Sequence, residues 1–108
     1  MPARNSIKEY GQDNFYHIYN RGAYKERIFL EEKDYEFFLY LFKRHLSKEP
    51  ALDKQQRPYL HLRDSIELVS YCLMPNHFHL LAFNKEQFGI TKLMRSIMTA
   101  YSMYYNKK

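Results

Sequence analysis

Several residue types that often reveal the role of a small protein are scarce or absent in this chain of 108 residues. Its one cysteine, Cys72, allows no disulfide within the chain, which is typical of a reducing compartment. It has no tryptophan, no internal repeat and no low-complexity tract. The N-terminus lacks an apolar signal region, and no apolar stretch approaches the roughly 20 residues of a membrane span. These absences favour a cytoplasmic protein without a membrane partner.

The residue types that are abundant point to a folded domain with an aromatic and basic character. The length fits one domain, and a content of 45% hydrophobic and 18% aromatic residues indicates a globular chain. Tyrosine, present 11 times, suits a core, but it also suits a surface that stacks on bases. The net charge of +5 favours a polyanionic partner such as nucleic acid, although many small proteins are mildly basic.

Hydrophobic periodicity predicts five elements in the order β-α-β-β-α. They are strands over 15–20, 66–73 and 77–83 and helices over 31–47 and 90–106. Residues 1–14 are expected to form an arm, and residues 48–64 a long loop that either touches a ligand or is an insertion. The fold class is therefore α+β, a ferredoxin-like antiparallel sheet with two helices on one face, in which the last strand of the βαββαβ pattern is missing. The whole of 1–108 is read as one domain.

The segment His77-Phe78-His79 carries the strongest chemical signal in the sequence. Residues i and i+2 of a strand share a face, so both imidazoles point the same way, roughly 7 Å apart at Cβ. Such a pair suits one divalent cation, whereas Phe78 points into the core. The alternative is two strand histidines satisfied by hydrogen bonds. His17 belongs to the first strand, where alternation does not fix its face. It shares the face of the pair if that strand lies beside the third, and a structural or DNA-facing role is favoured over ligation.

Six segments occur in an order typical of one family. They are Tyr16-His-Ile-Tyr-Asn-Arg-Gly22, Ile28-Phe29, Asp34-Tyr35, Tyr71-Cys-Leu-Met-Pro-Asn-His-Phe-His-Leu-Leu81, Leu93-Met94 and Tyr101-Ser-Met-Tyr-Tyr-Asn106. Together they resemble the single-tyrosine HUH transposases, in particular the REP-associated tyrosine transposases and related insertion-sequence transposases. The resemblance runs from about residue 15 to the end of the sequence.

The resemblance implies an enzyme of DNA transposition, a single-strand DNA endonuclease and transesterase. Members of the family cut and rejoin single-stranded or hairpin DNA on a ferredoxin-like sheet. A tyrosine attacks the phosphodiester and gives a 5′-phosphotyrosine intermediate and a free 3′-OH. Mg²⁺ or Mn²⁺, held by the residues that match His77 and His79, polarises the scissile phosphate.

One part of the family pattern is missing from this sequence. The family's nucleophile lies on a helix after the fourth strand in a Tyr-x-x-x-Asn or Tyr-x-x-x-Gln arrangement, whereas Tyr101 and Asn106 are five residues apart. Tyr101 could be a substitute nucleophile, but it continues an apolar helical stripe, which favours a core position. We therefore expect a sequence truncated before the fourth strand and the catalytic helix, and a chain that is inactive in strand cleavage.

Five residues are predicted to contact DNA because their side chains suit phosphates or bases. They are Asn20, Arg21, Lys25, Arg27 and Arg95. The first two could equally form a strand-end turn, and Arg95 could lie on a solvated helix face. A second function is also open, that of a non-enzymatic nucleic-acid-binding module of ferredoxin-like shape whose aromatic side chains stack on bases.

A homodimer is expected on two grounds. The resemblance implies dimerisation through the sheet, and a sheet without its last strand exposes an edge that invites pairing. Light scattering at micromolar concentration should therefore give the mass of two chains or more. A monomer under those conditions would contradict this expectation.

Overall fold

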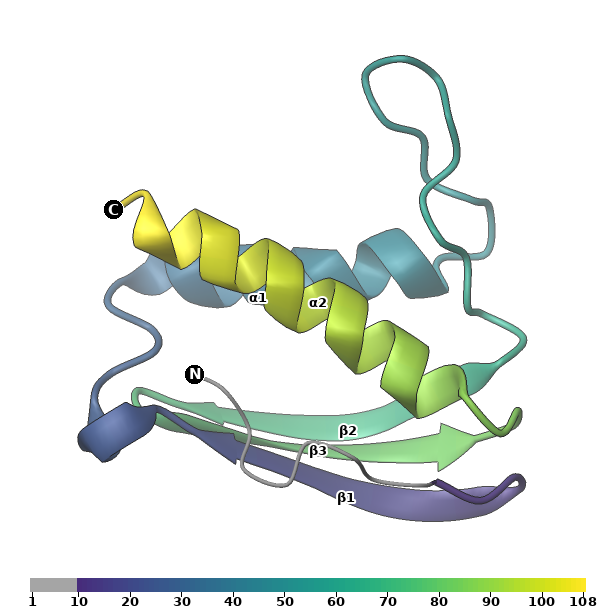
Figure 1. Cartoon of the computed structure of the whole chain (residues 1–108), viewed down its shortest axis with the longest axis horizontal. Helices are drawn as coiled ribbons and strands as arrows, with labels where there is room; N and C mark the ends of the chain where they lie inside the picture. The colour runs from purple at the N-terminus through teal and green to yellow at the C-terminus, as the bar shows by residue number, and fades with distance from the viewer. Residues whose placement is uncertain (1–9) are drawn as a thin grey trace.

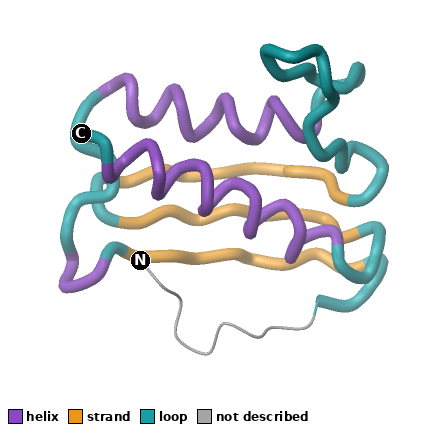
Figure 2. Tube along the Cα trace, turned by 45° about the horizontal axis from the view of Figure 1, so that its top comes forward, coloured by secondary structure: helices purple, strands orange, loops and turns teal. Residues whose placement is uncertain are grey.

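Two helices cover one face of an antiparallel sheet in the computed structural model, which describes residues 10–108 (Figure 1). The elements are β1 (Asn14–Arg21), a 3-10 turn η1 (Ala23–Lys25), α1 (Glu32–Leu46), β2 (Ile66–Met74), β3 (His77–Asn84) and α2 (Gly89–Asn106). The described residues form three strands in the order β1-β3-β2. Figure 2 shows both helices on the same side of these strands.

This arrangement confirms the predicted α+β class and the ferredoxin-like order of elements. Each predicted strand and helix is present, with ends that differ from the prediction by at most one residue. Most of the predicted arm, residues 1–9, lies outside the described part of the chain. No helix within residues 10–108 is both long and apolar enough to cross a membrane. The homodimer stays a prediction.

β3 is the central strand, and its side chains alternate strictly between the two faces of the sheet. Phe78, Leu80 and Ala82 face the helices and are 0, 2 and 1% exposed. The alternate residues His77, His79, Leu81 and Phe83 are half-buried on the opposite face. The predicted direction of Phe78 is thus confirmed, because its ring packs against Phe38 of α1 with the centroids 5.0 Å apart. Burial of a side chain of this size stabilises the fold by about 1.5–3 kcal/mol.

The predicted long loop joins α1 to β2 and projects from the body of the protein (Figure 1). It doubles back on itself, since the N–H of Tyr59 donates to the carbonyl of Ala51 and Leu52 pairs with Pro58. Its base is tied to α1, where the ring Nδ1 of His45 hydrogen-bonds the carbonyl of Leu60 at 2.7 Å. The loop therefore has few contacts with the sheet but a fixed base.

Asp34 joins the start of α1 to the end of α2. Its buried carboxylate accepts hydrogen bonds from the backbone N–H groups of Leu30 and Glu31, from the Tyr104 hydroxyl at 2.6 Å and from the Lys108 ammonium at 2.8 Å. Burial alone would raise the pKa of this carboxyl, but the four hydrogen bonds outweigh burial and lower the pKa to about 2.

This network predicts how stability depends on pH. Because the pKa of Asp34 is lower in the folded state than the ordinary 3.8, its contribution is complete above about pH 4 and is lost as the pH falls toward 2. Asp34→Asn should lower the free energy of unfolding at pH 7 by about 2 kcal/mol. It should also make that free energy less dependent on pH between 4 and 2, measured by urea unfolding at a series of pH values.

The matched control is Asp64→Asn, which changes an exposed carboxylate of the loop. Surface substitutions usually change stability by less than about 0.5 kcal/mol. An equal effect of the two substitutions on the pH dependence would show that the Asp34 network does not act in this way.

Candidate metal and nucleic-acid site

The two histidines of the His-x-His segment lie on the face of the sheet turned away from the helices. Among residues 10–108 no helix covers this face, which we call the open face (Figure 1). His77 and His79 are half-buried, and their ring centroids are 5.2 Å apart at an interplanar angle of 89°. β1 and β2 place further side chains beside them, because Arg21 and Met74 oppose His77 while Tyr19 and Cys72 oppose His79.

The tautomer of His77 is set by the residue before it. Nδ1 of His77 lies 2.7 Å from Oδ1 of Asn76, and an amide oxygen only accepts hydrogen bonds, so this nitrogen carries the proton. Asn76 is oriented in turn by its Nδ2, which lies 3.5 Å from the carbonyl of Lys25. In the neutral ring, Nε2 of His77 then keeps its lone pair, the form in which imidazole binds a metal.

His79 is paired with a third histidine from β1. Nε2 of His17 lies 2.8 Å from Nδ1 of His79, and the two rings are nearly parallel, at 6°, with centroids 5.0 Å apart. Burial lowers the pKa of His79, and its electrostatic interactions with the neighbouring His17 and His77 lower it further. His79 is thus favoured as the neutral imidazole that metal ligation needs.

These donors fit part of a metal site. Two neutral imidazoles on one strand face are suitable nitrogen ligands for a divalent cation. However, no group of three or more His, Cys, Asp or Glu side chains within the described residues is arranged to hold a metal ion. The described residues would therefore supply two ligands to such a cation and would leave most of its coordination sphere open.

Aromatic side chains lie beside the imidazoles on the open face and continue along it. Tyr19 is 45% exposed, and its ring centroid lies 4.9 Å from that of His79 and 6.0 Å from that of His77. Phe15 is 63% exposed and packs edge-on against Phe83, with centroids 4.8 Å apart. Such a surface offers flat apolar rings to a partner that stacks.

The five residues predicted to contact DNA lie in four different places. Arg21 is exposed, and its pairing with His77 places it on the open face. Lys25 and Arg27 are exposed in the connector beyond β1. Asn20 pairs with Phe78 and so lies on the helix side of the sheet, and Arg95 is exposed on α2 in the helix layer. The fold therefore brings Arg21 to the histidines but not Asn20 or Arg95.

The connector beyond β1 also holds the hairpin turn that precedes His77. The N–H of Gly22 donates to the carbonyl of Asn76, and the N–H groups of Ile28 and Phe29 both donate to the carbonyl of Pro75. A Cβ on Gly22 would lie 2.2 Å from the carbonyl oxygen of Glu26, so only glycine fits this close approach. The Arg-Gly segment is thus a structural support of the turn.

Tyr101, the substitute nucleophile considered from the sequence, lies in the core at 2% exposure. Its hydroxyl donates to the carbonyl of Ile28. Burial raises the pKa of Tyr101, and the nearby charge of Asp34 raises it further. A buried phenol that resists ionisation is a poor nucleophile, so the structure favours the core position.

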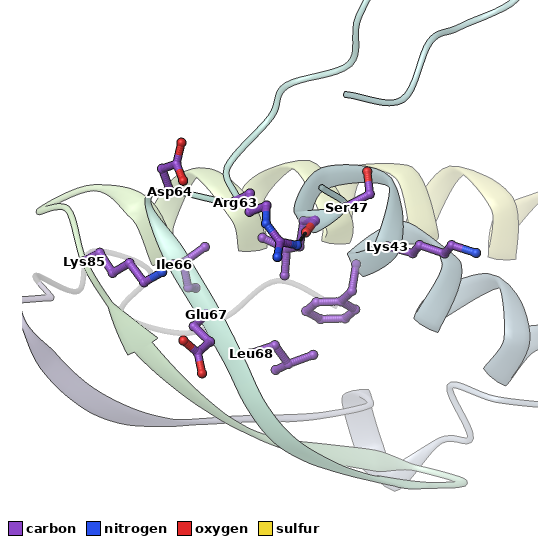
Figure 3. A pocket seen from close by; sticks show the side chains of 10 residues that line it. Lys43, Ser47, Arg63, Asp64, Ile66, Glu67, Leu68 and Lys85 are labelled. Carbon is purple, nitrogen blue, oxygen red and sulfur yellow. Dashed lines mark hydrogen bonds between the residues drawn. The ribbon is translucent and has the colours of Figure 1, made fainter. Parts of the chain in front are cut away.

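A pocket of about 410 Å³ lies away from the histidines, between the end of α1 and the start of β2 (Figure 3). Three basic side chains, Lys43, Arg63 and Lys85, line it together with Asp64 and Glu67. The mixed charges of this pocket and its distance from the His-x-His segment give it no part in the site.

Comparison with known families identifies the chain. The sequence model of the family described as "Transposase IS200 like" matches residues 54–108, the part that contains β2, β3 and α2. The chain belongs to the IS200-like transposase family. Comparison with curated proteins gave no match, and neither did comparison with solved structures. Transposases act on DNA, so membership of this family indicates a DNA partner.

In this IS200-like transposase, sequence reasoning did not identify Asn76 and Tyr19 as neighbours of the histidine pair, and it left the face of His17 open. Asn76 stands next to His77, and its position in the turn signalled a side chain free to hydrogen-bond locally. Tyr19 and His17 flank Ile18, the buried residue of β1, so the parity of that residue places both on the open face. Aromatic residues at neighbouring positions of this strand obscured the alternation in the sequence, and the burial of Ile18 in the fold resolves it.

Proposed function

We propose that this IS200-like transposase domain binds single-stranded or hairpin DNA on its open face and holds Mg²⁺ or Mn²⁺ through His77 and His79. The observation that carries the proposal is a pair of imidazoles on a strand face that no helix of residues 10–108 covers. Nδ1 of His77 is engaged by Asn76, which leaves its Nε2 for a cation. The cation, when bound, supplies Lewis-acid activation of the scissile phosphate. The family reaction that such a site serves is cleavage and rejoining of DNA through a 5′-phosphotyrosine intermediate.

The side chains around the histidines support a nucleic-acid substrate. Arg21 offers a planar donor fork to a phosphate within reach of the His77 position. Tyr19 and Phe15 are exposed rings on the same face, and stacking of a base on an aromatic side chain contributes about 1–3 kcal/mol. Single-stranded DNA presents a phosphate and an unstacked base at the same time, whereas the bases of a duplex are already stacked on one another.

Three tyrosines suggested by the sequence or by the geometry, Tyr101, Tyr104 and Tyr19, do not match the expected nucleophile. Tyr101 is buried and Tyr104 donates to Asp34, so neither hydroxyl is available on the open face. Tyr19 lies beside both imidazoles but belongs to β1 and has no Asn or Gln one helical turn further on. We therefore propose that the 108-residue chain binds DNA and metal but does not cleave.

Removal of the imidazoles tests the metal site. His77→Ala/His79→Ala should weaken Mn²⁺ binding by more than about 10-fold, because even loss of a residue that supports a metal ligand typically costs 10–100-fold in affinity. The measurement is the signal of free Mn²⁺ in electron paramagnetic resonance during titration. His61→Ala is the control, since His61 hydrogen-bonds the carbonyl of Ser47 in the loop and lies on no part of the open face.

Unchanged Mn²⁺ binding in the double variant would remove the chemical basis of this proposal. It would favour the second candidate, a non-enzymatic nucleic-acid-binding module. The observation in favour of that candidate is that the described residues supply two metal ligands and no third. Single-stranded DNA binding that survives in the double variant would belong to such a module.

A covalent-trapping experiment tests the proposed lack of cleavage. Incubation of the chain with single-stranded hairpin DNA and Mn²⁺ should give no protein–DNA adduct on a denaturing gel, because the open face carries no tyrosine in the family's arrangement. Tyr19→Phe serves as the comparison for any adduct that forms. An adduct in the unsubstituted chain would refute the proposed inactivity, and its loss in Tyr19→Phe would place the linkage on β1.

A further inference from the structure

His17 reaches diagonally across the β1–β3 pair to the second histidine of the His-x-His segment. Its register partner on β3 is Leu81, and the partner of His79 on β1 is Tyr19. Even so, the ring nitrogens Nε2 of His17 and Nδ1 of His79 lie 2.8 Å apart. β1 lies outside residues 54–108, the part that the family model matches, so the comparison gives His17 no role.

A hydrogen bond between two neutral imidazoles has one donor and one acceptor, and the choice has a chemical consequence. If His17 donates from Nε2, then His79 accepts at Nδ1 and carries its own proton at Nε2. Neither nitrogen of His79 then has a lone pair for a cation. If His79 donates from Nδ1 instead, its Nε2 is bare and can ligate. Only the second arrangement is compatible with a metal bound by His79.

We propose, on the basis of the proposed function, that His17 is a positioning residue that fixes the metal-binding tautomer of His79. Nε2 of His17 accepts the Nδ1–H of His79, which leaves Nε2 of His79 bare. Asn76 has the same relation to His77, whose Nδ1–H it accepts at 2.7 Å. Partners of this kind orient metal-ligating imidazoles and raise their basicity.

The two histidine ligands of one strand thus have partners from two separate parts of the fold. Asn76 comes from the turn immediately before β3, and His17 comes from β1, a neighbouring strand far away in the sequence. The near-parallel rings of His17 and His79, at 6°, keep the two nitrogens in line along the sheet surface. Pairing of β1 with β3 is therefore part of the metal site as well as of the fold.

The test compares His17→Phe with His17→Gln. Phenylalanine is a ring of similar shape and a good strand former, but it has no acceptor, whereas the glutamine side chain offers a carbonyl oxygen. Long-range ¹H–¹⁵N spectra of the metal-free protein report which nitrogen of each histidine is protonated. We expect the Nδ1–H form of His79 in the unsubstituted chain, a shift toward the Nε2–H form in His17→Phe, and a return of the Nδ1–H form in His17→Gln.

The Mn²⁺ affinity should follow the tautomer. His17→Phe should weaken binding about 10-fold or more, and His17→Gln should restore most of the loss. An Nε2–H form of His79 in the unsubstituted chain, or an unchanged tautomer and affinity in His17→Phe, would overturn the inference. Failure of the proposed function looks different: Mn²⁺ binding would then be equal in the unsubstituted chain and in His77→Ala/His79→Ala, whatever the spectra show.

Thermal unfolding followed by circular dichroism separates these outcomes from a general loss of structure. His17 is exposed, so both variants should unfold within a few degrees of the unsubstituted chain. If His17→Phe unfolds at a much lower temperature, the comparison rests on His17→Gln alone. In that case an Nε2–H form of His79 in the glutamine variant would overturn the inference.

Discussion

All eight residues of β3 pair with β1 on one side and with β2 on the other, and this register decides which side chains meet the helices. Phe78 enters the core against Phe38, and the two histidines face outward. A slip of one residue would reverse every side chain of the strand. It would expose Phe78 and bury two imidazoles without partners, and the loss of apolar burial alone would cost about 1.5–3 kcal/mol per large side chain.

Groups at both ends of β3 hold this register. At the start, three backbone N–H groups of the β1–α1 connector donate to the carbonyls of Pro75 and Asn76, and Gly22 permits their close approach. At the other end, the buried amide of Asn84 donates to the carbonyl of Gly11 and accepts from the N–H of Ile90, the second residue of α2. The strand that carries the histidines is therefore tied to β1 and to the helix layer at opposite ends.

The sequence was sufficient for the elements and for the direction of Phe78, because both depend on local periodicity. It was not sufficient for the direction of the Cys72 side chain, because strict alternation from the buried Ile66 would place this residue in the core. A β-bulge between Leu68 and Ser70 shifts the register, so Cys72 opposes His79 and is exposed. A bulge is an irregularity of pairing between two strands, and no hydrophobic period of one strand reveals it.

The relation between His17 and His79 was hidden for a similar reason. The first strand reads Phe15-Tyr-His-Ile-Tyr19, with aromatic side chains at neighbouring positions on both faces, so alternation gave no clear parity. The burial of Ile18 under the helices decides which residues of β1 face the core and which face outward, and this burial is a property of the packed structure. The diagonal contact then depends on how β1 is aligned with β3, which is a long-range feature.

The small number of protein ligands gives the proposed site a particular character. Mg²⁺ prefers octahedral oxygen coordination and is usually bound together with substrate phosphates and water rather than in an all-protein cage. Two imidazoles, without a carboxylate among the described residues to join them, would hold such a cation weakly on their own. A DNA phosphate near Arg21 would supply oxygen ligands and negative charge at the same place. Under the proposed function, the cation and single-stranded DNA should therefore each strengthen the binding of the other. The DNA phosphate supplies oxygen ligands to the cation, and the cation supplies positive charge to the phosphate.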